Sequence, residues 1–504
     1  MASEEKGGSP VSPLQRAEEE PPVSLAGRGR IAAGVAAARL AGRASRLLGR
    51  GGGTSLPGLV LRTVAPAALP HLAGQFARGS VLVAGTNGKT TTARMIAGIA
   101  AAGGLRLVHN SAGANLLRGV ASALVAVASP TGDLPRDRYD MGLFEVDEAA
   151  LPAIAAAVRP RIVLAMNLFR DQLDRYGELD SIATTWARAL ADLPVGAHVL
   201  LNADDPLMAW LGQDLPCHVT YYGIEDATAA VGALHHAADS ISCLVCGHAL
   251  HYSVVLYGHI GHYRCPNCGW ARPTPAVRAT LARPHGFGGT DLVIEGPGPG
   301  GVARFHLPLP GLYNAYNAVA ACAVAGALGL PLEAAAASLA GVTAAFGRSE
   351  VAQVDGRQMH LLLVKNPVGG NEVLRLLAAE AAQSGQPLHL LAMLNDNAAD
   401  GHDVSWIWDV DAEVLEGYVA RVVFGGARAE DLALRFKYAD VVDADARAVP
   451  WGIERETAAA LDAALAGCPP GGVLYAVVTY TAMLSLRAEL TARGHLRPYW
   501  EAVS

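Results

Sequence analysis

The chain has 504 residues, and 51% of them are hydrophobic, which provides enough apolar material for two or three domains with buried cores. The formal net charge is −7, so the sequence lacks the basic surface that general nucleic-acid binding requires. The same composition excludes a chain that is disordered throughout.

Residues 1–30 are expected to form a disordered tail, because they are rich in glutamate and poor in large apolar side chains. The alanine-rich segment 31–48 follows, and its arginines make it too polar to span a bilayer, so we expect a surface helix. No secretory signal or other membrane-spanning run is recognised. Four of the seven cysteines occur in two C-x-x-C pairs, which favours a reducing, cytoplasmic location.

Between residues 57 and 225, apolar runs alternate with helical stretches rich in alanine and leucine, a pattern typical of a parallel sheet with helices on both faces. Each expected strand leads into polar residues at its carboxyl end, where open α/β sheets bind ligands. These strands are 81–84, 141–146, 162–166 and 198–201. A second α/β pattern begins near residue 350, with strands expected at 360–364, 388–393, 421–424 and 474–479.

A glycine- and threonine-rich turn joins the strand 81–84 to a helical segment. Its residues are Gly85, Thr86, Asn87, Gly88, Lys89, Thr90 and Thr91. Glycines at such a turn let backbone N–H groups surround a polyphosphate, and the helix N-terminus adds positive potential. Lys89 would reach the outer phosphates and Thr90 would bind Mg²⁺. A purely structural turn is the alternative, because Val83 stands where the longer phosphate-loop pattern has its first glycine.

Acidic residues at the end of the strand 141–146 are candidates for the metal site. Glu145 is the predicted Mg²⁺ ligand together with Thr90, since Mg²⁺ prefers oxygen ligands. Asp147 should share the face of Glu145, while Glu148 begins the next helix. Asp147 and Glu148 can equally serve as caps of that helix, where acidic residues are favoured.

Two C-x-x-C pairs lie 18 residues apart and supply Cys243, Cys246, Cys265 and Cys268. This spacing predicts a tetrahedral Zn²⁺ site with four thiolates and no open position, and therefore a structural role. Four nearby histidines are expected not to bind the metal; they are His248, His251, His259 and His262.

Several motifs in this order resemble the Mur ligases. They are the glycine turn at 85–90, the acidic strand end at 145–148, N-x-x-x-D-x-L-D-x-x-G at 167–177, L-N-A-D-D-P at 201–206, P-G-x-x-N-x-x-N at 310–317 and F-G-R-S-E at 346–350. The resemblance implies ATP-dependent activation of a carboxylate as an acyl phosphate, followed by attack of an amine. It places Asn314 near the adenine and Arg348 near the phosphates, and makes Lys89 and Glu145 catalytic. A second metal is in doubt because Gln172 replaces the family's histidine.

From about residue 32 to its C-terminus, the chain resembles the MurT family, the Mur-ligase-like subunits of lipid II isoglutaminyl synthase. The matching segments are 51–58, 394–409 and 479–484, and the segment 364–372 stands where the amino-acid-adding Mur ligases have a D-x-x-x-N-P pattern. This resemblance implies amidation of the α-carboxyl of D-glutamate in lipid II at the cytoplasmic membrane face, in a heterodimer with a GatD-like glutaminase. The predicted units are a central ATP-binding domain at 31–345, an inserted zinc ribbon at 240–272 and a C-terminal Rossmann-like α/β domain at 346–504.

The three cysteines outside the zinc pairs lack the G-x-C-x-G elbow of a glutaminase nucleophile; they are Cys217, Cys322 and Cys468. The chain is therefore expected to activate a carboxylate but not to make ammonia. In the resembled family an aspartate of the 400–406 block completes the partner's Cys–His pair, and Asp403 is the first choice, with Asp400 second. The alternative is a simple turn. Trp406 and Trp408 could be core residues or interface anchors.

Two rival functions remain at this point. A stand-alone Mur or folylpolyglutamate-type ligase would add an amino acid without a glutaminase. A zinc-containing nucleic-acid-binding protein would use ATP as a switch, against which the acidic net charge argues.

Overall fold

The computed structural model describes residues 24–47, 55–110, 113–171, 179–231, 234, 238–297, 300–343, 348–442 and 449–497. Residues 1–23 of the expected tail lie outside this part of the chain. The last residues of that tail are helical, because helix α1 (Leu25–Leu47) begins before residue 30 and continues through the predicted surface helix. Among the described residues, no helix combines the length and apolar character needed to cross a membrane.

The central domain is built on a nine-stranded sheet in the order β11-β10-β9-β6-β5-β4-β1-β3-β2. Seven of the strands, from β2 to β9 in this order, are parallel, and β10 and β11 continue antiparallel at one edge. The strand bounds are β1 Ser80–Ala84, β2 Leu107–His109, β3 Met141–Val146, β4 Ile162–Ala165, β5 His198–Asn202, β6 His218–Ile224, β9 Val277–Pro284, β10 Thr290–Glu295 and β11 Val302–Leu307.

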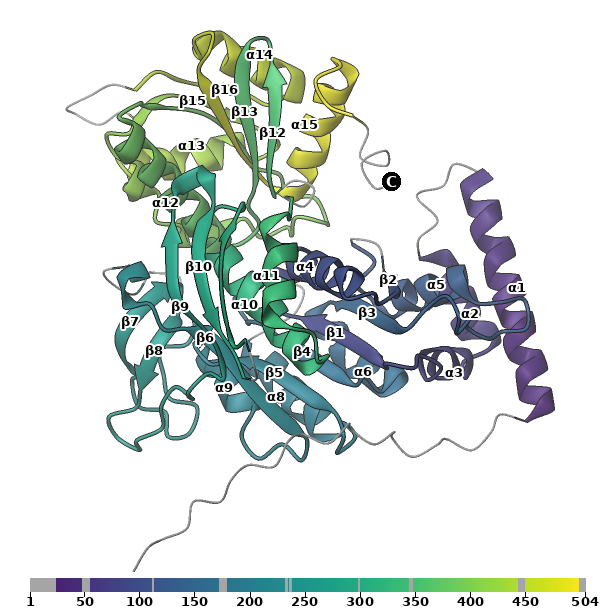
Figure 1. Ribbon diagram of the computed structural model, residues 1–504. Helices are drawn as coiled ribbons and strands as arrows, with labels where there is room; N and C mark the ends of the chain where they lie inside the picture. Colours follow the sequence, from purple (N-terminus) through teal and green to yellow (C-terminus); the bar gives the residue numbers. More distant parts are fainter. Residues whose placement is uncertain are drawn as a thin grey trace, which may run out of the picture.

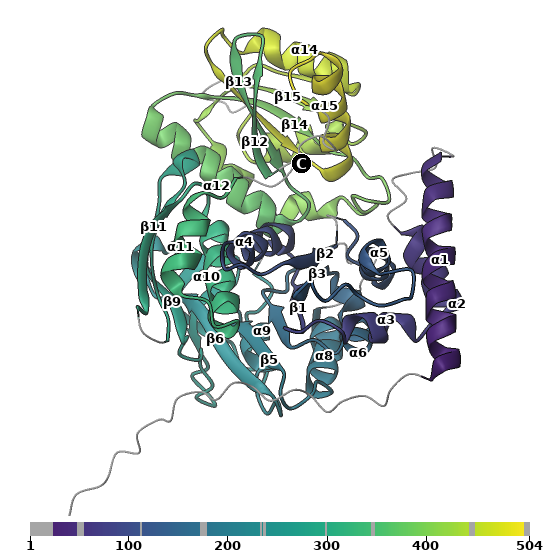
Figure 2. The same cartoon turned by 45° about the vertical axis from the view of Figure 1, so that its right-hand side comes forward.

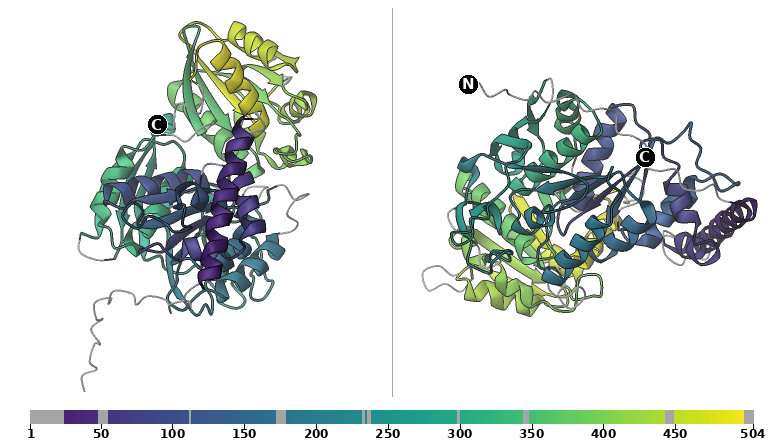
Figure 3. Two further views of the ribbon diagram at one scale, coloured as in Figure 1. Left: turned by 90° about the vertical axis from the view of Figure 1, so that its right-hand side faces the viewer. Right: turned by 90° about the horizontal axis from the view of Figure 1, so that it is seen from below.

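Helices cover both faces of this sheet (Figure 1). Alternate strand residues point to opposite faces, so Val81 and Val83 pack with one helix layer and Leu82 and Ala84 with the other. The first layer contains α4 (Lys89–Ala102), α10 (Leu312–Ala327) and α11 (Leu332–Ala340). The second contains α3 (Ala68–Ala73), α5 (Leu117–Val127), α6 (Leu151–Val158), α8 (Leu179–Ala191) and α9 (Pro206–Leu211). Helix α1 packs on α2 (Leu56–Val64) at the outer edge of this layer (Figure 3).

The predicted insertion forms an antiparallel hairpin of β7 (His251–Tyr257) and β8 (Ile260–Arg264). The four cysteines flank its open end, two before β7 and two after β8. The opposite end of the hairpin is deeply buried, since Leu256, Tyr257 and Ile260 belong to the same core cluster as α4 and α10. The inserted segment is therefore anchored to the central domain at its tip.

The C-terminal domain lies above the central domain in Figures 1 and 2. Its six-stranded sheet has the order β12-β13-β17-β14-β15-β16, parallel except for β12. The sheet is larger than the sequence predicts, because β12 and β16 add one strand at each edge. The bounds are β12 Arg348–Val354, β13 Arg357–Leu363, β14 Leu388–Met393, β15 Val419–Gly425, β16 Trp451–Glu454, β17 Val473–Val478, α12 Pro367–Ser384, α13 Ala429–Tyr438, α14 Thr457–Gly467 and α15 Tyr480–Ala492.

Candidate functional site

The glycine-rich turn lies between β1 and α4, at the carboxyl edge of the central sheet. Gly88 has φ +86°, and a Cβ at this position would lie 2.2 Å from Asn317 Oδ1, so both the backbone conformation and the space require glycine. Asn167, after β4, holds the turn in place: its Oδ1 accepts from Asn87 N at 2.9 Å, and its carbonyl accepts from Thr86 N at 3.0 Å. The loop is thus held in a fixed shape by the neighbouring strand end.

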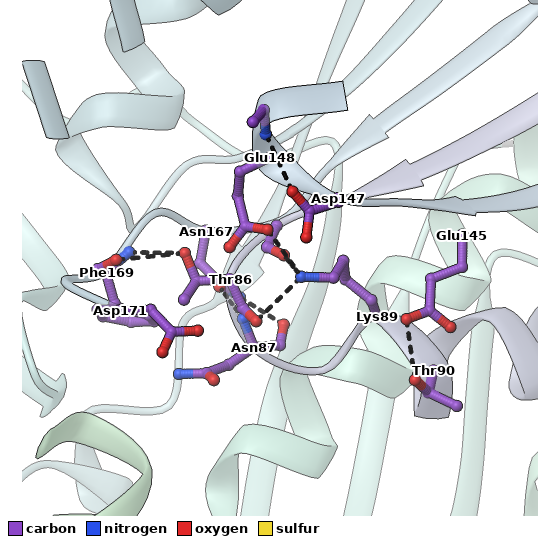
Figure 4. Close-up of polar contacts among 12 residues, drawn as sticks. Thr86, Asn87, Lys89, Thr90, Glu145, Asp147, Glu148, Asn167, Phe169 and Asp171 are labelled. Carbon is purple, nitrogen blue, oxygen red and sulfur yellow. Dashed lines mark hydrogen bonds and ion pairs between the residues drawn. The ribbon is translucent and has the colours of Figure 1, made fainter. Parts of the chain in front are cut away.

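Lys89, the charged residue of the turn, contacts the acidic segment at the end of β3 (Figure 4). Lys89 Nζ lies 3.1 Å from Glu148 Oε2, and both residues are buried. Lys89 also donates to the carbonyls of Gly85 and Thr86. Burial acts to raise the pKa of Glu148, but the charges of Lys89 and Lys365 outweigh it, so that pKa is lowered. A buried ammonium group therefore stands beside the loop with a single carboxylate partner opposite it.

Thr90 and Glu145, the two predicted Mg²⁺ ligands, are in contact. Thr90 Oγ1 donates to Glu145 Oε1 at 3.0 Å, and Glu145 is only 5% exposed. A hydroxyl and a carboxylate so close together at the helix N-terminus form a donor set of the kind Mg²⁺ uses beside phosphates. Asp147, by contrast, caps the short helix η1 (Glu148–Ala150) by accepting from Ala149 N at 3.3 Å, which is the capping role considered from the sequence.

Two residues of the C-terminal domain reach across to the turn. Lys365 Nζ donates to Asp171 Oδ2 and lies 3.5 Å from the carbonyl of Thr86. Asn366, which caps α12, donates from Nδ2 to Asn87 Oδ1 at 3.0 Å. Burial raises the pKa of Asp171, and the charge of Lys365 opposes the rise. The two domains therefore meet directly on the glycine turn.

A pocket opens between the turn and the C-terminal domain. It is lined on one side by Asn87, Gly88, Asn167, Tyr257, Tyr313 and Asn317, and on the other by Leu362, Leu363, Lys365, Asn366, Val368, Gly369, Glu372 and Val373. Asn314, expected near the adenine, does not line it. Its amide donates to the carbonyl of Pro310 at 2.7 Å and accepts from Asn317 at 3.0 Å. Asn314 thus supports Asn317, which occupies the pocket wall.

The hairpin tip of the insertion contributes to the same pocket. The ring of Tyr257 lies 5.4 Å from that of Tyr316 and 5.9 Å from that of Phe169. Phe169 in turn donates its backbone N–H to Thr86 Oγ1 at 3.0 Å. Phe169 therefore links the hairpin tip to the glycine turn through these two contacts.

The four predicted zinc ligands converge at the other end of the hairpin. Their sulfur atoms all lie within 4.8 Å of one another, with Cys243–Cys268 at 3.6 Å and Cys246–Cys265 at 3.5 Å. Zn–S bonds of about 2.3 Å in a tetrahedron place the sulfurs about 3.8 Å apart, so the arrangement fits zinc. His259, one of the four nearby histidines, is buried against Phe169 at the tip.

The two aspartates of the block 400–406 differ in burial and in hydrogen-bond partners. Asp400 is 6% exposed, and its two carboxylate oxygens accept from the backbone N–H and the hydroxyl of Thr481 at the start of α15. Asp403 is exposed and accepts from Ser405 N at 2.8 Å. Hydrogen bonding by the Ser405 side chain, and next by its backbone N–H, lowers the pKa of Asp403. Trp406 packs partly in the core, whereas Trp408 is 47% exposed. Asp403 is thus the better placed of the two for a partner.

The three remaining cysteines are buried, and burial raises the pKa of each thiol, that of Cys322 to about 12. A thiol held protonated in this way is a poor nucleophile.

The side chains of two predicted site residues are not described. Gln172 lies outside the described residues, and for Arg348 only the backbone, in β12, is described.

Comparison with known proteins places this site in a family. Family profiles match the Mur ligase middle domain over residues 83–268 and the MurT ligase C-terminal region over residues 363–483. The MurT subunit of lipid II isoglutaminyl synthase (glutamine-hydrolyzing) from Staphylococcus aureus (strain N315) is 33% identical over 420 residues, covering 83% of this chain and 89% of that protein. The chain belongs to the MurT family. The subunit of the same name from Streptococcus pneumoniae (strain ATCC BAA-255 / R6) is 32% identical over 465 residues, covering 91% of this chain and 97% of that protein.

Solved structures share the fold of this MurT-family chain. A pseudomurein peptide ligase type C from Methanothermus fervidus has a TM-score of 0.61 at 19% identity, covering 82% of this chain and 78% of that one. MurF from Acinetobacter baumannii also has a TM-score of 0.61, at 17% identity, covering 86% and 81%. The predicted α/β fold with a Mur-type central domain is confirmed, and the family assignment confirms an ATP-dependent ligase.

Some residues of the MurT-family site were not identified from the sequence. Lys365 and Glu372 lie in the segment 364–372, which was interpreted only as the replacement of the D-x-x-x-N-P pattern of amino-acid-adding ligases. A carboxylate within an apolar helical run was the available signal for Glu372. Tyr257 gave no signal, because nothing in the sequence shows that the inserted hairpin folds back onto the glycine turn.

Proposed function

We propose that this chain is the ligase subunit of a lipid II isoglutaminyl synthase. It uses ATP to convert the α-carboxylate of D-glutamate in the lipid II stem peptide to an acyl phosphate, releasing ADP. Ammonia then attacks the acyl carbon, phosphate leaves, and the product is D-isoglutamine. The names of the MurT relatives support the substrate and the reaction, and the geometry of the glycine turn supports the activation step.

The residues of the turn have distinct tasks in this reaction. Loop N–H groups and the start of α4 bind the phosphates, and Lys89 neutralises charge on the transferring phosphoryl group. Lys89 can do so by exchanging the Glu148 carboxylate, 3.1 Å away, for a phosphate oxygen. Thr90 and Glu145 would hold Mg²⁺, which supplies further charge neutralisation. Lys365 and Asn366 bring the C-terminal domain onto the loop, which orients the reacting groups and excludes water.

We assign the production of ammonia to a separate, GatD-like glutaminase that forms a heterodimer with this chain. The observation in favour is that the described cysteines outside the zinc cluster are buried thiols with raised pKa values. Asp403, exposed on the C-terminal domain, is proposed to orient the partner's catalytic histidine. The complex would act at the cytoplasmic face of the membrane, where lipid II is made available, and zinc would serve only to hold the inserted hairpin.

Reconstitution tests this function. The chain is purified with the glutaminase and supplied with lipid II, glutamine and ATP, and phosphate release and amidated lipid II are measured. Amidated product that requires ATP, and requires either the glutaminase with glutamine or added ammonium, is expected. Turnover with an amino acid and no glutaminase would instead support a stand-alone ligase, and absence of both phosphate and product would reject the proposal.

A further inference from the structure

The pocket beside the glycine turn contains one acidic side chain, Glu372 of α12. If phosphates bind at residues 85–90, as the proposed function requires, the rest of the nucleotide must leave the turn past Asn87 and Gly88, which form one wall of this pocket. Tyr313 and Asn317 continue that wall along α10, and the C-terminal domain closes the opposite side. The pocket is thus positioned to receive the nucleoside.

Glu372 is short of hydrogen-bond donors. Its side chain is 11% exposed, and its Oε1 lies 3.5 Å from Arg375 Nη1. Within the described part of the chain, its Oε2 accepts no hydrogen bond. Burial raises the pKa of Glu372 to about 7, although the charge of Arg375 opposes the rise. An added pair of donors would therefore favour the ionised carboxylate.

The sugar of a nucleotide supplies such donors. An ionised carboxylate only accepts hydrogen bonds, and the two adjacent ribose hydroxyls match its two oxygens. Acidic side chains bind ribose hydroxyls in this way in dinucleotide-binding folds. Leucines occupy the neighbouring wall at 362 and 363, and Oδ1 of Asn366 already accepts from Gly369 N at 2.9 Å. Glu372 is therefore the carboxylate that this side of the pocket offers to a diol.

We propose that Glu372 binds the ribose hydroxyls of the nucleotide and makes the site selective for ribonucleotides. Tyr257, from the tip of the inserted hairpin, lines the same pocket. This inference rests on the proposed function only in requiring that a nucleotide binds at the turn. It assigns a nucleotide contact to the C-terminal domain.

The test measures dissociation constants for ATP, 2′-deoxy-ATP and 3′-deoxy-ATP without acceptor substrate, by calorimetry, for the unaltered chain and Glu372→Gln. The unaltered chain should prefer ATP, and Glu372→Gln should lose at least tenfold in ATP affinity while its affinity for one or both deoxy nucleotides changes little. Glu380→Gln, on the same helix but outside the pocket lining, is the matched control and should bind like the unaltered chain.

Each other outcome has a distinct meaning. If Glu372→Gln lowers the affinity for all three nucleotides equally, the carboxylate contacts another part of the nucleotide, such as the adenine amino group, and the ribose assignment is wrong. If it changes none of them, Glu372 is not a binding residue. Failure of the unaltered chain to bind any nucleotide would reject the proposed function instead. Circular dichroism and zinc content establish that each variant is folded.

Discussion

Replacing Glu372 with glutamine is predicted to stabilise the folded chain, and to do so more at high pH than at low pH. Burial raises the pKa of Glu372 from 4.5 to about 7, so the folded state resists its ionisation while the unfolded chain does not. Below pH 4.5 the carboxyl group does not lower the free energy of unfolding. The destabilisation grows as the pH rises to 7 and remains in full above pH 7. Glutamine at this position has no charge and does not destabilise the folded chain in this way.

The magnitude follows from the pKa difference at about 1.4 kcal/mol per pH unit. The stability gain from Glu372→Gln should be about 1 kcal/mol at pH 5.5 and about 3 kcal/mol at pH 8.5, less the lost attraction to Arg375. Urea unfolding followed by tryptophan fluorescence at both pH values measures it, with Glu380→Gln as control. A gain that does not widen by roughly 2 kcal/mol between the two values would refute the reasoning. The same variant should bind ATP more weakly, so stability and nucleotide affinity would move in opposite directions.

Three further predictions concern the other parts of the site. Lys89→Ala combined with Glu148→Gln, which avoids a buried unpaired carboxylate, should lower ATP turnover at least a hundredfold while circular dichroism stays unchanged; turnover close to normal would remove Lys89 from catalysis. Asp403→Asn should impair amidation with glutamine but spare amidation with ammonium, whereas equal loss with both nitrogen sources would point to folding. Cys265→Ser should release zinc and, because the hairpin tip carries Tyr257 into the pocket, raise the Kd for ATP; unchanged metal content would contradict the zinc site.

Much of the architecture follows from local sequence patterns. Apolar runs ending in polar residues located β1, β3, β4 and β5, because parallel strands buried on both faces must be apolar and must present their ligands at one edge. The edge strands β12 and β16 were not predicted. Polar residues in β12, Glu350 and Gln353 among them, interrupt the apolar pattern that identifies a central strand.

The site was predictable where a local sequence pattern marks its residues. The contact between Thr90 and Glu145 was predictable because each ends or follows a strand of the same sheet, and the cysteine spacing located the four-cysteine cluster. Contacts between distant segments were not predictable: the hydrogen bonds of Asn366 to Asn87 depend on how two domains pack. The hydrogen bond from the Asn314 amide to the carbonyl of Pro310, just before the same helix, could likewise be seen only in the coordinates, and the assignment of Asn314 to the nucleotide stays a prediction.

The central claim is that this chain activates a carboxyl group by phosphorylation and that ammonia then displaces the phosphate. Lipid II carrying ¹⁸O in the α-carboxyl of its D-glutamate tests this directly, with the purified heterodimer, ATP and glutamine, and mass spectrometry of the released phosphate. One ¹⁸O atom should appear in inorganic phosphate for each amide formed. Unlabelled phosphate, or label in AMP with release of pyrophosphate, would contradict the acyl phosphate route.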